Sequence, residues 1–435
     1  MEIAIIIIFC LGYLLITLEH AVDLSKTATA LITGVLCWTV YMMYNDAETV
    51  TNQLLEHLGE ISGILFFLMV AMTIVELIDS HDGFDLINKS IRTRSLRKLL
   101  WIICILTFFL SAILDNLTTT IIMVTLAAKM VRNEKTRLIF VGMIVLTANA
   151  GGAWSPMGDV TTTMLWIGGQ VSTIPIMTKL IMPSLVNMFV PMVIVTFMIS
   201  GNLESDDKEK SGEHDVTVSA REQRFVFIAG LTALVSVPIF KTVTHLPPFM
   251  GMLLGLGALW LLTELLHKRK AAEQRKQLSV ASALERMDVP SVFFFLGILL
   301  AVGVLQEVGL LTQLSELLTR SVKQEQLILS IIGVLSAIVD NVPLVAATMR
   351  MFSLDMYPMD HTFWILLAYC AGTGGSLLII GSAAGIAAMG MEKISFGWYV
   401  KNITWLAFAG YIAGIGTFLL QEFVLSSFGS GLPGE

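Results

Sequence analysis

Long apolar runs alternate with short polar segments along the whole chain. Many of the runs approach the ~20 residues that a helix needs to cross a bilayer. The pattern predicts ten membrane spans, two of which are interrupted by glycine, proline or serine. The predicted spans are 3–18, 27–44, 61–78, 138–167 (interrupted), 176–199, 224–240, 247–266, 290–306, 361–391 (interrupted) and 398–425.

Two further apolar stretches, 99–131 and 326–352, differ from these spans. As one helix the first would be about 50 Å long, well over the ~30 Å hydrocarbon core, yet it is short for two spans. An Asp-Asn pair lies at the middle of each stretch, at 115–116 and 340–341. We therefore predict two re-entrant hairpins, because irregular backbone is tolerated at that depth only where protein or water surrounds it.

Composition agrees with a membrane protein. Hydrophobic residues make up 55% of the chain and charged residues 14%, whereas a soluble domain carries about 25% charged residues. The four cysteines lie in apolar segments without CxxC spacing, which predicts neither a disulfide nor a metal framework. No HExxH, GxSxG or P-loop pattern is present, so we expect no enzyme activity, no cofactor and no nucleic-acid partner.

The distribution of positive charge predicts the orientation, because cytoplasmic loops carry an excess of Lys and Arg. With the N-terminus outside, 22 of the 27 Lys and Arg residues lie on the cytoplasmic side, and the acidic segment 45–60 forms an outer loop. The even number of spans then places the C-terminus outside as well. Residues 201–223 are polar and lack periodicity, which predicts a cytoplasmic linker between a first transmembrane repeat, 1–200, and a second, 224–426.

The two halves resemble each other at a nearly constant offset of 223 to 228 residues. The matching segments are LFFL at 65–68 with FFFL at 293–296, SAILDN at 111–116 with SAIVDN at 336–341, and GGAWSPMGD at 151–159 with GGSLLIIGS at 374–382. Each half has five crossings, an odd number, so the second half is inverted and its hairpin enters from the opposite side. The predicted fold is an all-α polytopic membrane protein of two inverted repeats, each with one re-entrant hairpin and one broken helix, which is typical of secondary transporters.

Three aspartates are predicted to lie within the membrane, where a carboxylate is costly and marks an ion pathway by default. Oxygen-bearing side chains surround them, as Na⁺ and Li⁺ require, and glycine or proline interruptions free backbone carbonyls. Burial raises the pKa of a carboxyl group, so such a group can hold a proton when no cation is bound. The predicted ion and proton site comprises Asp115, Asn116, Thr118, Asn149, Ser155, Asp159, Thr161, Thr162, Ser336, Asp340, Asn341, Ser376 and Ser382, with Na⁺ assigned to Asp115, Asn116, Asp340 and Asn341.

Simpler interpretations remain open for these residues. The Asp-Asn pairs would also serve as N-caps of the second arm of each hairpin, and threonine hydroxyls often bond to carbonyls of the preceding helical turn. Asp159 has no acidic counterpart, because Ser382 takes its place in the second half. That asymmetry indicates a role in charge compensation or proton handling. His57 and His361 are expected at the outer face, exposed to solvent.

Three runs of the chain resemble the NhaD-type sodium/proton antiporters of bacteria, a family within the ion transporter superfamily. The runs are EHLGEISGILFFLMVAMTIVELID, SAILDNLTTTIIM and GGAWSPMGDVTTTMLW. The resemblance covers nearly the whole chain. It implies export of Na⁺ or Li⁺ for H⁺ by a homodimer in the bacterial inner membrane, so that both termini would be periplasmic. By matching residues, it assigns the site to Asp115, Asn116, Asp159, Thr161, Thr162, Asp340 and Asn341.

Two other functions remain open. Anion symport or arsenite transport occurs in the same superfamily, but the Ser-Asn-Thr motifs of the dicarboxylate symporters are absent, and a carboxylate at each hairpin tip would repel an anion. An intramembrane aspartyl protease using Asp115 and Asp159 would normally need a Gly-x-Gly-Asp run, which this chain lacks at both aspartates, the run before Asp159 being Pro156-Met157-Gly158. The sequence therefore favours cation/proton antiport.

Overall fold

The computed structural model describes residues 1–17, 19, 24–86, 91, 93–202, 218–321, 324–338 and 340–429. In this part of the chain the regular elements are all helices, and the β pairing is one isolated bridge between Ser95 and Asn202. The helices form two compact units: Met1–Arg92 with Glu204–Thr312, and Thr93–Leu203 with Gln313–Glu435. Each unit therefore combines a segment of the first half with a segment of the second.

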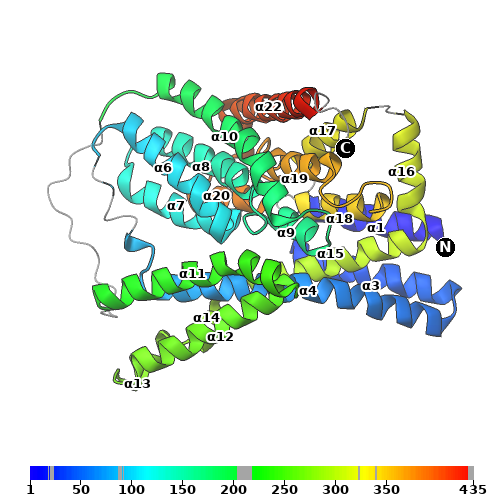
Figure 1. The fold of residues 1–435 in the computed structure, drawn as a ribbon, viewed down its shortest axis with the longest axis horizontal. Helices are drawn as coiled ribbons and strands as arrows, with labels where there is room; N and C mark the ends of the chain where they lie inside the picture. Colours follow the sequence, from blue (N-terminus) through cyan, green and yellow to red (C-terminus); the bar gives the residue numbers. More distant parts are fainter. Residues whose placement is uncertain are drawn as a thin grey trace. The chain divides into compact units, whose positions relative to one another are not determined.

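Unit 1 is built from helices that lie before the first predicted hairpin and their counterparts in the second half (Figure 1). Its helices are α1 (Glu2–Thr17), α3 (Lys26–Tyr44), α4 (Ala47–Ser80), α11 (Ala220–Thr244), α12 (Pro248–His267), α13 (Ala272–Gln277), α14 (Val280–Arg286) and α15 (Val289–Glu307). Helix α3 packs on α1 and α15, α11 packs on α12, and α4 contacts α11, α12, α14 and α15. The core of unit 1 thus forms around α3, α4 and α15.

The prediction of an outer loop at 45–60 was wrong, because α4 begins at Ala47. Asp46 is its N-cap, and its carboxylate accepts a hydrogen bond from the Thr49 amide at 3.0 Å. At 34 residues the helix is about 51 Å long, well over the ~30 Å hydrocarbon core. A helix of this length accommodates polar residues in its first turns, since these project beyond the core.

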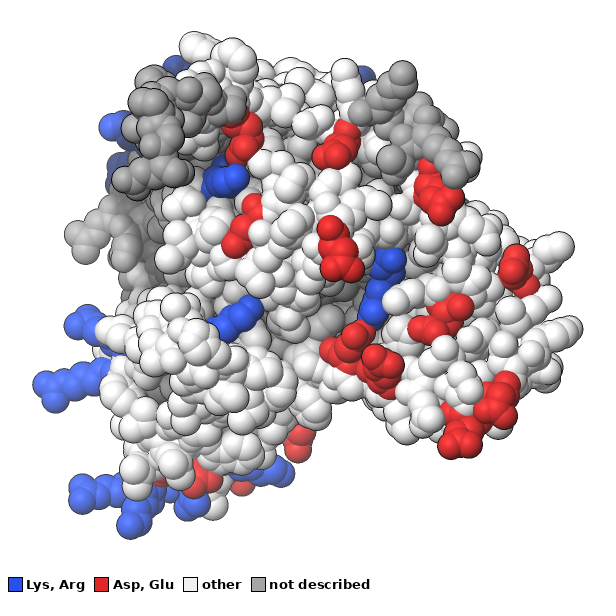
Figure 2. Space-filling model, turned by 45° about the vertical axis from the view of Figure 1, so that its right-hand side comes forward, with Lys and Arg blue, Asp and Glu red and all other residues white. Residues whose placement is uncertain are grey.

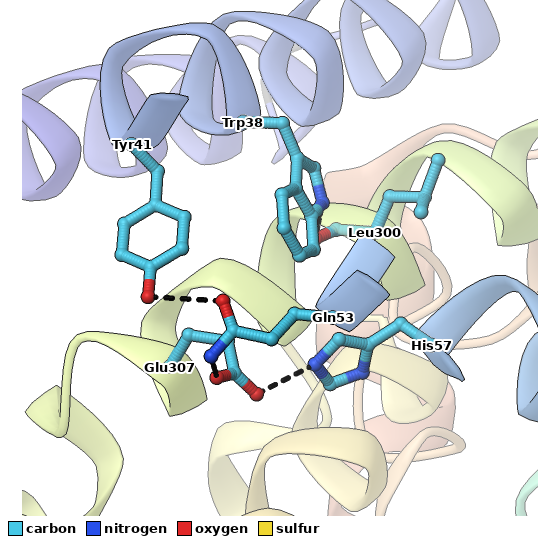
Figure 3. A network of polar contacts seen from close by, with 6 residues as sticks. All are labelled: Trp38, Tyr41, Gln53, His57, Leu300 and Glu307. Carbon is cyan, nitrogen blue, oxygen red and sulfur yellow. Dashed lines mark hydrogen bonds and ion pairs between the residues drawn. The ribbon is translucent and has the colours of Figure 1, made fainter. Parts of the chain in front are cut away.

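A polar network joins α3, α4 and α15 within unit 1 (Figure 3). Tyr41 donates to Gln53 Oε1 at 3.2 Å, Gln53 Nε2 donates to Glu307, and His57 Nε2 lies 3.0 Å from Glu307 Oε1. The Trp38 indole donates to the Leu300 carbonyl at 3.0 Å. His57 is buried, contrary to the expectation of a solvent-exposed histidine, because its ring faces α15 from the inner side of α4.

Unit 2 contains both predicted hairpins and both broken helices. Its helices are α6 (Leu96–Leu114), α7 (Asn116–Met130), α8 (Glu134–Ala153), α9 (Val160–Ile167), α10 (Thr173–Met198), α17 (Glu325–Leu335), α18 (Asn341–Met351), α19 (Thr362–Gly374), α20 (Ala383–Glu392), α21 (Phe396–Tyr399), the π-helical turn η1 (Val400–Thr404) and α22 (Trp405–Gly429). Helix α16 (Leu310–Ser321) contains the sequence boundary between the units.

The two halves of unit 2 repeat one order of elements (Figure 1): a helix pair, an interrupted helix and a long helix. The pairs are α6–α7 and α17–α18, and the interrupted helices are α8–α9 and α19–α20. Helix α7 packs on α20, α18 packs on α9, and α8 packs on α19. The second arm of each pair therefore contacts the short helix that follows the break in the other half.

Length and composition agree with the predicted membrane fold. Among the described residues, nine helices are long and apolar enough to span a membrane. Eight of them fall on predicted spans, and the ninth is α6, a hairpin arm that proves to be 19 residues long. The predicted spans 3–18 and 361–391 contain shorter helices. Most of the face shown in Figure 2 carries no charged side chain, as expected of a protein surrounded by lipid.

Candidate functional site

The breaks in α8–α9 and α19–α20 present polar side chains at helix ends. Asp159 is the N-cap of α9, and its Oδ1 accepts hydrogen bonds from the Thr161 amide at 2.8 Å and the Thr161 hydroxyl at 2.7 Å. Ser382 is the N-cap of α20 and accepts from the Gly385 amide at 3.2 Å. Such capping satisfies an otherwise unpaired amide at the start of a helix, and it fixes each side chain at the break.

Asp159 is the hydrogen-bond acceptor for two asparagines from different hairpins. Asn116, the first residue of α7, donates from Nδ2 to Asp159 Oδ2 at 2.6 Å and to Asn149 Oδ1 at 2.9 Å. Asn341, the first residue of α18, places its Nδ2 3.4 Å from Oδ1 and 3.5 Å from Oδ2 of Asp159. The first hairpin thus contacts this carboxylate closely and the second at longer range.

Asn149 in α8 extends the same contacts to the second break. Its Nδ2 donates to Ser376 Oγ at 2.9 Å and to Ser382 Oγ at 3.0 Å. We call the connected set the Asp159 cluster; its members are Asn116, Asn149, Asp159, Thr161, Asn341, Ser376 and Ser382. All seven are at most 5% exposed, so the cluster is a buried polar site that draws on four segments of unit 2.

Close backbone packing brings each hairpin against its break. A Cβ atom added at Gly158 would lie 2.6 Å from the Ser111 carbonyl oxygen, and one added at Gly381 would lie 2.6 Å from the Ala337 carbonyl oxygen. Neither distance leaves room for a side chain, so glycine is required at both positions. In both halves, a glycine at the break therefore allows the backbone to pack closely against the preceding hairpin.

Serine hydroxyls also stabilise the packing of the hairpins against the interrupted helices. Ser111 donates to the Ala148 carbonyl at 2.6 Å, and Ser336, its counterpart in the second half, donates to the Ala371 carbonyl at 2.9 Å. Ser155 donates in the same way to the Ala112 carbonyl at 2.5 Å. The predicted site residues Ser155 and Ser336 thus bond to backbone outside the Asp159 cluster.

The two hairpin aspartates act as N-caps. Asp115 accepts from the Thr118 amide at 2.8 Å and from the Thr118 hydroxyl at 2.9 Å, and Asp340 accepts from the Val342 amide at 3.2 Å. The capping interpretation is therefore confirmed for both. Both are half-buried, whereas Asp159 is 1% exposed. Thr162, also predicted for the site, is fully buried, and its hydroxyl has no hydrogen-bond partner within the described residues.

Two residues that the sequence did not single out support the second break. Tyr399 donates its hydroxyl to the Ser376 carbonyl at 2.8 Å, and Thr404 donates to the Leu377 carbonyl at 2.6 Å. Tyr399 directly precedes the π-helical turn η1, and Thr404 is the last residue of that turn. A π-helical turn often accompanies a functional site, but it leaves no periodic pattern in the sequence.

The electrostatic character of the cluster follows from its donors. Amide and hydroxyl groups donate to Asp159, and within the described chain no Lys, Arg or His side chain hydrogen-bonds to any cluster member. A carboxylate removed from water without a cation is unfavourable. Bound H⁺ or a small metal cation would each supply the missing charge, and amide and hydroxyl oxygens are ligands that a hard cation accepts.

Comparisons with known proteins agree on a transporter. A family model described as "Citrate transporter" matches residues 13–361. Sodium/proton antiporter 1 of Arabidopsis thaliana is 47% identical over 96% of this chain and 72% of its own length. The Na⁺/H⁺ antiporter NhaD of Alkalimonas amylolytica is 34% identical over 95% of this chain and 89% of its own length.

A solved structure resembles the fold. The YdaH transporter of Alcanivorax borkumensis matches with a TM-score of 0.53 over 88% of this chain and 90% of that protein. The two sequences are 11% identical, so this likeness concerns the fold alone.

Proposed function

The chain belongs to the family of NhaD-type sodium/proton antiporters, and on this basis we propose that it exchanges Na⁺ for H⁺ at the Asp159 cluster. It is a multi-pass membrane transporter and not an enzyme, since its relatives are antiporters in a transporter family. The observation that carries the proposed site is the burial of Asp159 among amide and hydroxyl donors.

Competition for one carboxylate is sufficient for exchange. When Asp159 is protonated, its charge is neutralised and no cation is needed; when Na⁺ binds, the proton must leave. Asn116 and Asn341 donate through Nδ2 and retain carbonyl oxygens that can ligate a cation. The hydroxyls of Thr161, Ser376 and Ser382 supply further oxygens. Li⁺, also a small hard cation, is expected to compete at the same group.

Exchange also requires that the site open to one side of the membrane at a time. We propose that the two hairpins, predicted to enter from opposite sides, supply this alternating access. In a variant lacking the four native cysteines, single cysteines at Leu117 and Leu344 should each react with a membrane-impermeant reagent added from either side, because both lie close to asparagines that contact Asp159. Labelling from one side only would contradict alternating access.

The proposed function is tested in everted membrane vesicles with a fluorescent reporter of ΔpH. Addition of Na⁺ or Li⁺ should dissipate ΔpH with the wild-type protein and not with Asp159→Asn. Asparagine remains a good N-cap, so this variant removes the titratable group and keeps the cap. Asp46→Asn is the matched control, because Asp46 is an exposed N-cap of α4.

Two results would contradict the proposal: dissipation of ΔpH by Na⁺ in Asp159→Asn at the wild-type rate, or no response of the wild type to any cation. In the second case, uptake of labelled citrate is the next assay, because the matching family model is described as a citrate transporter. Anion transport is the second candidate on that ground alone, and the buried carboxylate of Asp159 opposes it.

The proposal also concerns the membrane in which the protein lies and its oligomeric state. The relatives include both plant and bacterial proteins, so bacterial inner membrane with periplasmic termini stays a prediction from sequence. A homodimer is likewise proposed from the resemblance alone. Cysteine accessibility at the termini and cross-linking in native membranes test these two predictions.

A further inference from the structure

A groove runs between α11 and α12 in unit 1, far along the sequence from the Asp159 cluster. Its volume is about 970 Å³, and the described residues that line it come from these two helices. In Figure 1 both helices are green, and they pack on each other. Apart from two arginines, the larger lining side chains are apolar, among them Phe225, Ile228, Leu254 and Leu262. The volume is at the upper end of the range of small-molecule sites, about 300–1,000 Å³.

Helices α11 and α12 are the least covered of the candidate spans. Protein buries 22% of the apolar window of α11 and 28% of that of α12, against 33% or more for each of the other seven. Within the groove, Ile228 is 55% exposed and Leu254 is 62% exposed. Exposure to lipid tails is ordinary for a membrane helix, so the shape and the charge of the groove carry the argument.

Among the described residues of the lining, the charged ones are two arginines at one end. Arg221 and Arg224 lie in the first turns of α11, three residues apart and therefore on one helix face. Both are exposed, and neither has an ion-pair partner in the described part of the chain. The neighbouring Glu222 pairs with Lys270 at 2.9 Å, so the charges of that pair offset each other.

The arginines and the apolar groove together form an amphipathic site. The lining extends along α11 to Thr244, about 36 Å from its start, which is long enough for the ~30 Å hydrocarbon core. An anion near Arg221 would also lie at the N-terminal end of α11, where the helix dipole favours negative charge. Arginine binds phosphate oxygens through a planar fork of N–H donors.

We propose that this groove binds an anionic phospholipid, whose phosphate contacts Arg221 and Arg224 and whose acyl chain lies along the apolar lining. By the predicted orientation the arginines are cytoplasmic, the side on which basic pockets between spans bind anionic headgroups. A second copy of the chain fits less well. In a two-fold dimer within the membrane, the arginine ends of both copies would lie at the same depth, and like charges repel.

The test is native mass spectrometry of the purified full-length protein with phosphatidylglycerol and with phosphatidylcholine of the same acyl chains. The wild type should retain phosphatidylglycerol at least tenfold better. Arg221→Gln with Arg224→Gln should abolish this preference. Lys268→Gln with Arg269→Gln is the matched control, because these exposed cations follow α12 outside the lining, and it should bind as the wild type does.

A second variant tests the apolar part of the site. Ala258→Trp fills the exposed lining of α12 without changing charge, and it should reduce retention of phosphatidylglycerol at least tenfold while the protein keeps its oligomeric state. Equal retention by the double arginine variant and the wild type would overturn the proposal. Conversion of a dimer to a monomer by Ala258→Trp would also overturn it, because the groove would then hold a second copy of the chain.

Discussion

Asn116 donates a hydrogen bond of 2.6 Å to Asp159, and the two residues are the first of α7 and the N-cap of α9. The contact joins the tip of a hairpin to the break of a neighbouring helix. Both groups are at most 5% exposed. A change in the charge of Asp159 therefore acts directly on the amide of Asn116, and in the proposed exchange it would couple ion binding to the position of the hairpin.

Removal of the Asn116 side-chain amide should weaken transport more than removal of the Asn341 amide, its counterpart in the second half. Asn116→Ala deletes the bond of 2.6 Å, whereas Asn341→Ala deletes contacts of 3.4 and 3.5 Å. A hydrogen bond to a charged group contributes about 1.5–3 kcal/mol. The Na⁺ concentration for half-maximal ΔpH dissipation should thus rise about tenfold or more in Asn116→Ala and less in Asn341→Ala. The reverse order would contradict the assignment.

The two serines that accept from Asn149 should be partly redundant. Ser376→Ala or Ser382→Ala leaves the other hydroxyl within 3.0 Å of Asn149 Nδ2. The double variant leaves that buried amide without either acceptor, which costs about 1–3 kcal/mol. We expect activity within about threefold of wild type for each single variant and a loss of about tenfold or more for the pair. Additive single effects would argue against a shared partner.

Glycine at the first break should contribute to the stability of the fold. In Gly158→Ala the new Cβ atom meets the Ser111 carbonyl oxygen at 2.6 Å, so the backbone must shift. Gly257→Ala in α12 is the control, because nothing lies within 4 Å of its added Cβ atom, and alanine favours a helix by up to about 1 kcal/mol. Thermal melting in detergent should show a lower Tm for the first and an unchanged or higher Tm for the second.

The pair His57 and Glu307 should stabilise unit 1. The two side chains join α4 to α15 at 3.0 Å, and His57 is buried. A double-mutant cycle of His57→Ala and Glu307→Ala, followed by denaturation, should give a coupling free energy of about 1 kcal/mol. Glu56→Ala removes an exposed neighbour and should couple to Glu307→Ala by less than about 0.3 kcal/mol. Equal coupling in both cycles would contradict a specific contact.

His81, the C-cap of α4, is fully buried. Its Nδ1 lies 2.7 Å from the Leu77 carbonyl oxygen and its Nε2 lies 3.2 Å from His267 Nε2. Burial is the largest cause of a lowered pKa of His81; the Leu77 carbonyl opposes the shift, Lys270 adds to it, and Glu222 and Asp82 oppose it. The folded protein therefore takes up a proton at His81 at a lower pH than the unfolded chain does.

Stability should consequently fall as the medium becomes acidic. The contribution of neutral, buried His81 to the free energy of unfolding is fully present above about pH 6.5, the pKa of histidine in the unfolded chain. It is lost as the pH falls below that value toward the lower pKa of His81 in the folded protein. We expect the Tm to drop between about pH 7.5 and pH 5.5, and to drop less in His81→Gln. The same drop in both proteins would show that another group causes the effect.

Hydropathy was sufficient to predict most of the helical spans and both interruptions, because each depends on local composition. That the helix pairs α6–α7 and α17–α18 are re-entrant stays a prediction. Hydropathy was wrong at 45–60, where polar residues belong to the first turns of α4. It also placed His57 in solvent, although the residue is buried against α15. A pattern that is read along one helix does not report which neighbouring helix covers it.

The sequence by itself determined the kind of protein, the repeated order of elements and the polar residues that unit 2 contains. Only the tertiary structure decided which of those residues meet. Three aspartates were candidates for the site on sequence grounds. Asp115 and Asp340 cap α7 and α18 through local contacts that the sequence already suggested, whereas packing directs both asparagines toward Asp159. The physical reason is separation along the chain: Asn116 and Asp159 are 43 residues apart, and Asn149 and Ser382 are 233 apart. Contacts over such distances depend on how helices pack, which no local pattern encodes.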